Sequence, residues 1–381
     1  MKILHVAQPV DGGVAAYVLA ACADQVARGW RVAVACPDGG RLADGLAAAG
    51  IPRLRWTAGR NPGPGSVAEA RRLAEIIEAR RPDALHLHAS KAGLAGRLRT
   101  RLSRRLPRRL PTVFQPHGWS WLAVDGGLRA ATLAWERAAA RWTDLFVCVG
   151  AAEAEAGREH GVPGRYTVVR NGVDLRRYAV ADTAARAAAR HALRLDPGAP
   201  LAVCVGRVTR QKGQDVLLAA WPRVRAECPD ATLALIGDGD QLAALSAAPA
   251  PGVTFAGAVD DVRSWLAAAD LVVLPSRWEG LPLTVLEAFA SGRPVVASRV
   301  PGLAEVVPSS VGALVPPDDP AALGDAVARR LRDPDLRRAE GRAAATHAVR
   351  FDLRRTFDRL ADATASAAER LGVTSRSEVT P

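Results

Sequence analysis

The sequence of 381 residues lacks the features that would place it in a membrane or outside the cell. It has no run of about 18 uncharged apolar residues, the length that a membrane-spanning helix needs, and only Lys2 precedes the short apolar stretch at residues 3–6. Its five cysteines form no CxxC pair and no metal-ligand spacing, and most stand in apolar runs. We therefore expect no signal peptide and no spanning helix, and we expect buried, reduced thiols in a cytoplasmic protein.

The composition is that of a globular chain with an excess of positive charge. Hydrophobic residues make up 49% and charged residues 24% of the sequence, which excludes disordered, collagen-like and disulfide-stapled chains. The length exceeds one ordinary core and suits two domains of about 150 to 200 residues. The net charge of +12 fits an anionic partner such as nucleic acid, a phosphorylated substrate or an anionic membrane.

A run of arginines without any acid supplies much of this charge. It comprises Arg97, Arg99, Arg101, Arg104, Arg105, Arg108 and Arg109. Since no helix-turn-helix, zinc-finger or aromatic RNA-binding signature accompanies it, we expect no nucleic-acid partner. Two interpretations stay open: a solvated basic helix, or a patch for an anionic membrane surface, where each basic residue contributes about 1 kcal/mol.

Short β-rich runs alternate with Ala-rich helical patterns in the first half of the chain and again after residue 197. Such alternation predicts parallel βαβ units. A polar, Ala- and Arg-rich passage at 179–196 interrupts it, so we place a linker there. The predicted fold class is α/β, with two doubly wound Rossmann-like domains, 1–180 and 197–350, that face each other across a cleft. Residues 372–381 are expected to form a frayed tail.

Several candidate residues follow directly after predicted strands. Ligands of doubly wound sheets bind at this edge, beyond the carboxyl ends of the strands, where helix N-termini direct amides at anions. The candidates are Gly12 and Gly13, His117 and Gly118, Asn171 and Gly172, Arg207, and Glu279. If the two edges face each other, they line one interdomain cleft. Gly12-Gly13 could admit a phosphate, but the full GxGxxG fingerprint with its acidic residue is missing, which disfavours a dinucleotide dehydrogenase.

Two cations, Arg207 and Lys212, stand just after a buried strand in Gly206-Arg207-x4-Lys212-Gly213. Two fixed cations suit a diphosphate, because each charge-assisted hydrogen bond to phosphate contributes on the order of 1.5 to 3 kcal/mol. They would also stabilise negative charge on a departing nucleoside diphosphate.

Two carboxylates, Glu279 and Glu287, stand with seven residues between them. Pro282 suits the first turn of a helix, which puts Glu279 in a loop and Glu287 on the helix. The free amides of Leu281, Leu283 and Thr284 lie between them at the positive end of the helix. Such a turn could hold a sugar nucleotide at both ends. The alternative is a pair of glycosidase carboxylates, which the nearby cations disfavour because a neutral glycoside carries no diphosphate.

Other polar residues give weaker signals. His86 and His88 alternate on one strand and, with Ser90 and Lys91, could border the entrance of a second substrate. The Asp238-Gly239-Asp240 segment imitates a metal-binding DxD motif but fits an ordinary glycine turn, so we predict no metal.

Taken together, these segments resemble a known family. GRVTRQKG, EGLPLTVLEAFASGRPVVAS and PGLAEVV, with GG near the start, HG after the fifth predicted strand and NGVD at the end of the first half, resemble the retaining glycosyltransferases of family 4, which have the GT-B fold. The resemblance implies a hexosyltransferase that needs no metal and retains the anomeric configuration by front-face attack, in which the leaving phosphate helps to take the acceptor's proton. No protein nucleophile is then required.

The resemblance also assigns roles to the candidate residues. Gly13, Arg207 and Lys212 would contact the donor diphosphate, Glu287 the ribose, and Glu279 with the amides of Leu281, Leu283 and Thr284 the transferred sugar, while His117 would lie against that sugar near the reacting carbon. The N-terminal domain would bind the acceptor, and the helix at 353–371 would pack back onto it.

The partners follow from the same resemblance. A UDP-sugar is the expected donor and a GDP-sugar the second choice. The segment HLHASKAGLAGRL resembles family members of exopolysaccharide or capsule assembly, so a lipid-linked saccharide is the expected acceptor. The corresponding hypothesis for location is a peripheral position on the inner face of the cell membrane. The alternatives are transfer to a soluble natural product or metabolite, and a non-catalytic sugar-nucleotide-binding protein.

Overall fold

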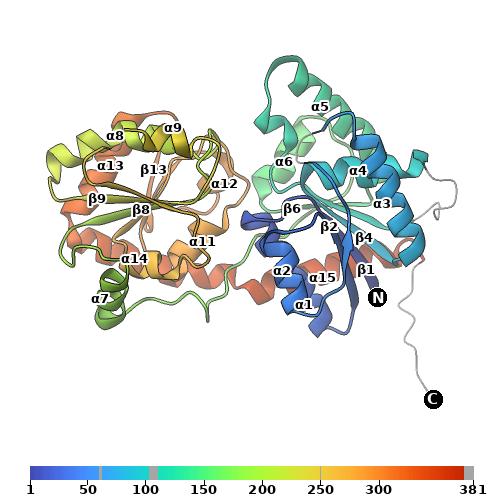
Figure 1. Cartoon of the computed structure of the whole chain (residues 1–381), viewed down its shortest axis with the longest axis horizontal. Helices are drawn as coiled ribbons and strands as arrows, with labels where there is room; N and C mark the ends of the chain where they lie inside the picture. Colours follow the sequence, from blue (N-terminus) through green and yellow to red (C-terminus); the bar gives the residue numbers. More distant parts are fainter. Residues whose placement is uncertain (60–61, 103–109, 249, 373–381) are drawn as a thin grey trace. The chain divides into compact units, whose positions relative to one another are not determined.

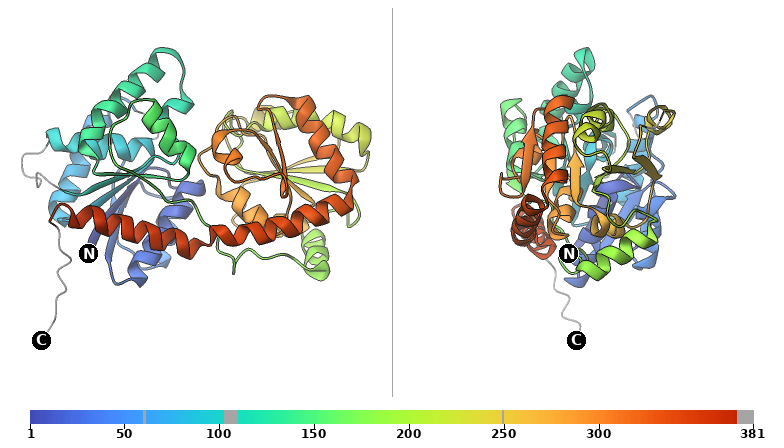
Figure 2. Two further views of the ribbon diagram at one scale, coloured as in Figure 1. Left: turned by 180° about the vertical axis from the view of Figure 1, so that it is seen from behind. Right: turned by 90° about the vertical axis from the view of Figure 1, so that its left-hand side faces the viewer.

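The computed structural model describes residues 1–59, 62–102, 110–248 and 250–372 (Figure 1). The chain forms two compact units. Unit 1 contains residues 1–170 and the chain from residue 356 onward, and unit 2 contains residues 171–355. Each unit is a parallel sheet with helices on both faces, which is the predicted α/β class (Figure 2).

Unit 1 is built on seven parallel strands in the order β3-β2-β1-β4-β5-β6-β7. The strands are β1 (Lys2–Ala7), β2 (Arg31–Cys36), β3 (Arg53–Arg55), β4 (Ala84–His88), β5 (Thr112–Gln115), β6 (Leu145–Cys148) and β7 (Tyr166–Val168). The helices are α1 (Gly12–Ala27), α2 (Gly40–Ala48), α3 (Ser66–Arg80), α4 (Ala89–Leu102), α5 (Gly126–Ala139), α6 (Ala151–Glu159) and α15 (Leu353–Glu369), with short 3-10 turns at Ser120–Ala123 and Ala140–Trp142.

Unit 2 is built on six parallel strands in the order β10-β9-β8-β11-β12-β13. The strands are β8 (Leu201–Val205), β9 (Thr232–Ile236), β10 (Val253–Gly257), β11 (Leu271–Leu274), β12 (Val295–Ser298) and β13 (Gly312–Val315). The helices are α7 (Thr183–Ala192), α8 (Gln214–Glu227), α9 (Leu242–Ser246), α10 (Arg263–Ala268), α11 (Leu283–Ala290), α12 (Pro301–Ala304), α13 (Pro320–Arg332) and α14 (Pro334–Ala348), followed by a 3-10 turn at Val349–Phe351.

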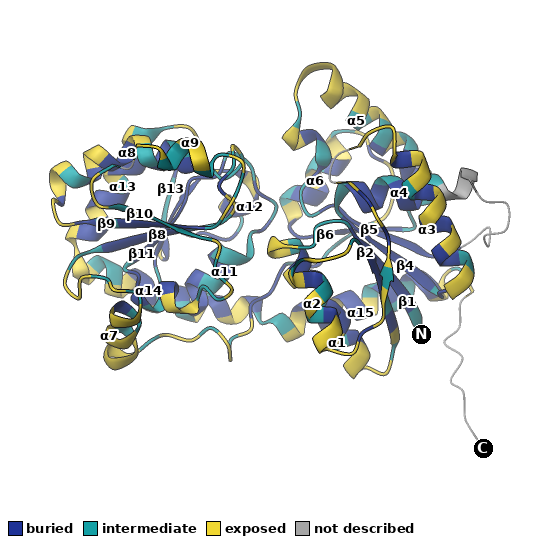
Figure 3. Ribbon diagram, in the orientation of Figure 1, coloured by how far each residue is buried: buried dark blue, intermediate teal, exposed yellow. Residues whose placement is uncertain are grey.

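The strand order reverses at one point in each sheet. In unit 1 the reversal lies between β1 and β4, and in unit 2 between β8 and β11. The central strands are buried on both faces, which is why their sequences are continuously apolar rather than alternating (Figure 3). A crevice opens beyond the carboxyl ends of the strands at such a reversal, so the residues after β1, β4, β8 and β11 are placed to bind a ligand.

The boundary between the units differs from the predicted one. Residues 171–180 were assigned to the N-terminal domain and the passage at 179–196 to a linker, but both segments belong to unit 2. The Asn171 side chain donates to the carbonyl of Leu281 at 2.6 Å. The predicted linker contains α7, and its arginines make specific contacts with the rest of unit 2 instead of facing solvent.

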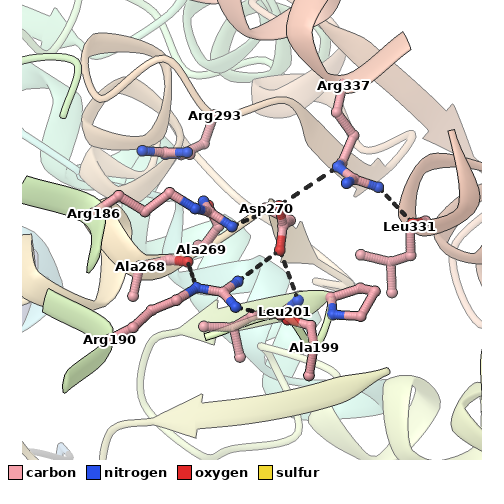
Figure 4. Close-up of polar contacts among 12 residues, drawn as sticks. Arg186, Arg190, Ala199, Leu201, Ala268, Ala269, Asp270, Arg293, Leu331 and Arg337 are labelled. Atoms are coloured by element: carbon pink, nitrogen blue, oxygen red, sulfur yellow. Dashed lines mark hydrogen bonds and ion pairs between the residues drawn. The ribbon is translucent and has the colours of Figure 1, made fainter. Parts of the chain in front are cut away.

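Asp270 is the centre of these contacts. Figure 4 shows Arg186 and Arg190 of α7, together with Arg337, directed at its carboxylate. Arg186 and Arg190 each bind one carboxylate oxygen at 2.8 Å, and the amide of Leu201 donates to the carboxylate at 2.9 Å. Arg190, only 3% exposed, also donates to three carbonyls of residues 196–199. Because these charge-assisted bonds are among the stronger ones in proteins, they hold α7 on unit 2.

Helix α15 belongs mainly to unit 1. Thr356 donates through its hydroxyl to the carbonyl of Arg170 at 2.9 Å. Arg28 and Asp358 form an ion pair at 2.5 Å, and the ring of Phe357 packs edge-on against Tyr17. The chain therefore returns to its first unit at its end, while the predicted tail beyond residue 372 lies outside the described residues.

Arg97 does not belong to the predicted basic surface patch, because it is fully buried. Its guanidinium binds both carboxylate oxygens of Glu136, at 2.8 and 2.9 Å, and donates to the carbonyl of Gly93. It also stacks over Phe114 at 4.0 Å from the ring centroid. The side chains of residues 99–109, the rest of the patch, lie outside the described part of the structure. Within the described ranges, no helix combines the length and apolarity needed to cross a bilayer.

Replacing Arg97 should strongly destabilise unit 1. We expect Arg97→Met to lower the free energy of unfolding by about 3 to 5 kcal/mol, because Glu136 is then a buried carboxylate without its cation. Urea denaturation measures the change. The double variant Arg97→Met with Glu136→Gln should recover most of the loss, and a single variant that costs less than about 1 kcal/mol, an ordinary surface effect, would contradict the structural role.

Candidate active site

In unit 2 the loops after β8 and β11 lie against each other at the strand-order reversal. Gly213, at the end of the first loop, has φ of +69°. A Cβ atom at this position would lie 2.1 Å from the carbonyl oxygen of Pro275 in the second loop. Only glycine therefore permits both the left-handed conformation and this close approach, which brings the predicted cationic segment beside the predicted acidic one.

Lys212 and Glu279 form the centre of this site. The ammonium of Lys212 lies 2.5 Å from Oε1 of Glu279, and the hydroxyl of Ser276 donates to the same oxygen at 2.7 Å. The side chains of Lys212 and Glu279 are 18% and 5% exposed. The sequence predicted separate roles for the two residues, and the structure joins them in one half-buried ion pair.

Arg207 is an exposed cation of the same segment. Its guanidinium donates to the side chain of Gln211 at 3.2 Å, and its carbonyl accepts from the side chain of Gln214 at 3.0 Å. The bond from Gln214 ties the start of the turn to the first residue of α8, while the guanidinium stays exposed. This arrangement suits an anionic ligand at the mouth of the site.

Arg277, which the sequence reasoning missed, ties the two loops together. Its guanidinium binds both oxygens of Asp215 at 2.9 and 2.7 Å and Asp318 at 2.7 Å, and it donates to the carbonyl of Arg210. The hydrogen bond with Asp215 raises the pKa of Arg277 and lowers that of Asp215. An arginine two residues before Glu279 and an acid in the first turn of α8 were the available signals.

Glu287 lies on α11, as predicted, and binds a partner that was not predicted. The hydroxyl of Tyr178 donates to its Oε1 at 2.9 Å. Burial raises the pKa of Glu287, while this hydrogen bond acts in the opposite direction. Tyr178 was missed because it was assigned to the other domain.

The backbone between Glu279 and Glu287 is also close to the prediction. Pro282 is the N-cap of α11 rather than its first helical residue, and the helix begins at Leu283. The amides of Leu283 and Thr284 therefore belong to the first turn, where intrahelical acceptors are absent. The Leu281 side chain is buried at 4% exposure, so only its backbone could contact a ligand.

Unit 1 carries a second candidate binding group, formed by the backbone amides at the start of the helix that follows β1. Gly12, with φ of +77°, and Gly13 are exposed at the start of α1. Asp11 does not cap this helix, because its carboxylate accepts from the amide of Arg41 at 2.9 Å. The first amides of α1 are therefore available to an anion, as the prediction for Gly13 requires.

His117 lies after β5 in a strained turn that a missed carboxylate supports. His117 is partly exposed, with φ of +54°. The buried Glu153 accepts from the amides of Gly118 at 2.5 Å and Val149 at 2.7 Å. Burial raises the pKa of Glu153 to about 7, although these two hydrogen bonds act in the opposite direction. Glu153 therefore fixes the backbone that presents His117.

His88 and Lys91 do not occupy the surface position predicted for them. His88 is fully buried and Lys91 is 4% exposed. The ammonium of Lys91 lies 2.6 Å from a carboxylate oxygen of Glu69 and donates to the hydroxyl of Ser66. Since an ion pair inside the unit satisfies Lys91, neither residue borders an entrance for a second substrate.

Three buried histidines, His5, His86 and His88, have ligand atoms within 4.8 Å of one another. Nδ1 of His5 and Nε2 of His88 lie 2.9 Å apart, at hydrogen-bonding distance from each other. The rings of His86 and His88 are stacked, with centroids 4.1 Å apart. Both ring nitrogens of His5 and both of His88 already lie at hydrogen-bonding distance from other side chains, so the three histidines do not offer a free set of zinc ligands. At Asp238, the carboxylate accepts from the amide of Gly239, as in the predicted turn.

Comparison with known proteins links both units to one enzyme class. Residues 11–177 match the model described as Glycosyltransferase Family 4, and residues 199–333 match the model described as Glycosyl transferases group 1. The chain is 36% identical over 210 residues to a D-inositol 3-phosphate glycosyltransferase of Segniliparus rotundus, covering 52% of this chain and 46% of that protein. It is 34% identical over 189 residues to a GDP-mannose-dependent monoacylated alpha-(1-6)-phosphatidylinositol monomannoside mannosyltransferase of Corynebacterium glutamicum, covering 46% and 50%. The chain thus spans about half the length of these curated relatives.

Among solved structures, Anabaena HepE in complex with UDP and glucose is similar to the whole chain. The TM-score is 0.81 and the sequence identity 23%, over 96% of this chain and 100% of HepE. At this identity the likeness establishes the fold.

Proposed function

Because the chain belongs to the family 4 glycosyltransferases and has the GT-B fold, we propose that it is a retaining hexosyltransferase that moves a sugar from a nucleoside-diphosphate sugar to an acceptor hydroxyl. The observation that carries the proposal is the Lys212–Glu279 ion pair beside the exposed Arg207. The two cations, Arg207 and Lys212, suit a diphosphate, and the carboxylate of Glu279 suits sugar hydroxyls.

In this scheme the groups of unit 2 divide the donor among them. Arg207 and Lys212 bind the diphosphate and stabilise the charge that develops on it as the sugar leaves. Glu279, with the amides of Leu281, Leu283 and Thr284, binds the hydroxyls of the transferred sugar. The Glu287 carboxylate, held by Tyr178, binds the ribose.

Unit 1 contributes Gly13 and His117 to the reaction. The first amides of α1 at Gly13 bind the distal phosphate, and His117 contacts the sugar that is transferred. In the proposed front-face attack the leaving phosphate takes the acceptor's proton. The anomeric configuration is then retained without a protein nucleophile. We propose that no metal is needed, since two cations and the helix amides supply the positive charge at the diphosphate.

A UDP-sugar is the proposed donor and a GDP-sugar the second candidate. HepE was solved with UDP, which supports the first, and the Corynebacterium relative is named as GDP-mannose-dependent, which supports the second.

A matched pair of carboxamide variants tests the donor assignment. With a panel of sugar nucleotides and saccharide acceptors, we expect wild-type protein to release nucleoside diphosphate, and Glu279→Gln to lower kcat on the order of a hundredfold, as for loss of a transition-state contact. Glu227→Gln, a change of the same type at an exposed carboxylate at the C-terminal end of α8, is the control. Full activity of Glu279→Gln would remove that residue from the scheme.

The proposed acceptor is a lipid-linked saccharide at the inner face of the cell membrane. The named acceptor of the Corynebacterium relative is a phosphatidylinositol monomannoside, which supports a lipid acceptor. Transfer to a soluble metabolite is the second candidate, supported by the inositol 3-phosphate named for the Segniliparus relative.

Liposome flotation distinguishes these acceptor environments. We expect the protein to float with vesicles that contain anionic lipid and to lose this association in high salt, through the arginines between residues 99 and 109. Replacing Arg104, Arg105, Arg108 and Arg109 with serine should weaken flotation. Equal flotation with neutral and anionic vesicles would remove the support for a membrane position.

A further inference from the structure

A chain of hydrogen-bonded imidazoles runs inward from His117. Nε2 of His117 lies 3.1 Å from Nδ1 of His88, and Nε2 of His88 lies 2.9 Å from Nδ1 of His5. Nε2 of His5 lies 2.7 Å from Oε1 of Gln25, on α1. His88 and His5 are fully buried and Gln25 is 1% exposed, whereas His117 is partly exposed. This histidine chain, made of His117, His88, His5 and Gln25, thus connects an accessible imidazole to an amide inside the unit.

The amide end determines the direction of every hydrogen bond in the histidine chain. The carbonyl oxygen of Gln25 can only accept, so His5 must donate from Nε2. A neutral imidazole has one N–H group, so Nδ1 of His5 accepts from Nε2 of His88. By the same reasoning Nδ1 of His88 accepts from Nε2 of His117. All three rings then carry their proton on Nε2, and Nδ1 of His117 keeps an unprotonated lone pair.

The rings are neutral at ordinary pH. Burial lowers the pKa of His5 to about 4 and that of His117 to about 3, and it lowers the pKa of His88 well below the usual value. The histidine chain also ends at an amide, which is not a base, so a proton received at His117 could not leave through Gln25. His117 is therefore suited to accept a hydrogen bond and not to remove a proton.

We propose that Gln25, His5 and His88 are positioning residues that fix His117 with an unprotonated Nδ1, so that it accepts a hydrogen bond from a hydroxyl of the sugar substrate. The inference rests on the proposed function, in which His117 contacts the transferred sugar. It explains why two histidines and a glutamine, His5, His88 and Gln25, occupy a core where apolar side chains would pack without any polar requirement. It also predicts selectivity, because an acceptor nitrogen binds a hydroxyl group but repels a carbonyl or phosphate oxygen.

His86 lies beside the histidine chain without belonging to it. Its ring stacks on His88 with centroids 4.1 Å apart and lies 5.1 Å from His5. On the other side, Tyr17 contacts His117 edge-on at 5.1 Å. These neighbours hold the rings in place, while the direction of the hydrogen bonds depends on Gln25.

The tautomers can be measured without any enzymatic assay. Full-length protein labelled with ¹⁵N-histidine gives long-range ¹H–¹⁵N correlations that distinguish a protonated ring nitrogen from an unprotonated one, and single substitutions assign the signals. We expect the Nε2-protonated form at His5, His88 and His117. In Gln25→Met, which removes the terminal acceptor, His117 should populate both tautomers. Cys22→Val, a buried change on the same helix, should leave the wild-type pattern.

Kinetics give a second readout. Gln25→Met should lower kcat roughly three- to tenfold, the value of one neutral hydrogen bond, and leave the Kd for nucleoside diphosphate unchanged. The pH profile of wild-type kcat should show no inflection near the usual histidine pKa.

An Nδ1-protonated His117, the result if the Gln25 amide donates to His5, would overturn the proposal. Wild-type kcat in a Gln25→Met protein with mixed tautomers would overturn it as well. Absence of sugar transfer by wild-type protein would instead refute the proposed function, while the tautomer of His117 would still decide the direction of the histidine chain.

Discussion

Lys212→Met should almost abolish sugar transfer. The substitution removes a cation from the diphosphate site, where a charge-assisted hydrogen bond contributes on the order of 1.5 to 3 kcal/mol. It also leaves the buried carboxylate of Glu279 without the ammonium that lies 2.5 Å away. We therefore expect kcat/KM to fall by more than roughly a hundredfold, and the affinity for nucleoside diphosphate to fall roughly ten- to a hundredfold. Initial rates of nucleotide release and calorimetric titration measure the two effects.

Two further variants separate the loss of charge from the loss of structure. The double variant Lys212→Met with Glu279→Gln should regain thermal stability, since no unpaired carboxylate remains, but it should not regain turnover. Arg210→Met, which removes a cation from the same turn, should keep most of the activity. If Lys212→Met keeps wild-type affinity and turnover, the cationic turn does not bind the diphosphate.

Unit 1 should lose stability steeply between pH 6 and pH 4.5. The pKa values of His5, His86, His88 and His117 are lowered by burial, to about 4 for His5 and about 3 for His117, whereas an unfolded histidine titrates near 6.5. Below that value the unfolded chain binds protons that the folded unit does not, so the stability present above pH 6.5 is lost as the pH falls.

Glu153 acts in the opposite direction in this window. Its folded pKa of about 7 is above the unfolded value, so the folded unit binds one proton more through this group. The net uptake on unfolding is about three protons, which corresponds to a slope of about 4 kcal/mol per pH unit. Urea denaturation at several pH values, with hydrogen exchange of β1 and β4 peptides to report on unit 1, measures this slope. His86→Phe should lower the number of protons taken up on unfolding by about one, and the slope should decrease in proportion. A constant stability from pH 6.5 to pH 5 would show that the imidazoles are not buried.

The predicted and observed folds agree where one physical rule is sufficient. Continuous apolar strands between helical segments required parallel sheets covered on both faces, and strands such as Leu201–Val205 and Leu271–Leu274 are indeed central. The rule that ligands bind beyond the carboxyl ends of strands placed Arg207 and Glu279 at one edge. Their local sequences required no knowledge of distant contacts.

The remaining features depend on contacts between segments that are far apart in the sequence. The α7 segment was interpreted as a linker because its arginines look solvated, and only the position of Asp270 shows that they are paired. Arg97 was counted with a surface patch, although Glu136 neutralises it inside the unit. Tyr178 and Glu153 also act on partners far along the chain, so composition and spacing could not reveal them.

The most direct test of the account is a calorimetric titration of wild-type protein with UDP, GDP and ADP. The account predicts saturable binding of at least one of these nucleoside diphosphates at one site per chain, weakened roughly ten- to a hundredfold in Arg207→Ala. If none of the three binds, or if Arg207→Ala binds as tightly as wild type, the loops after β8 and β11 do not form a sugar-nucleotide site.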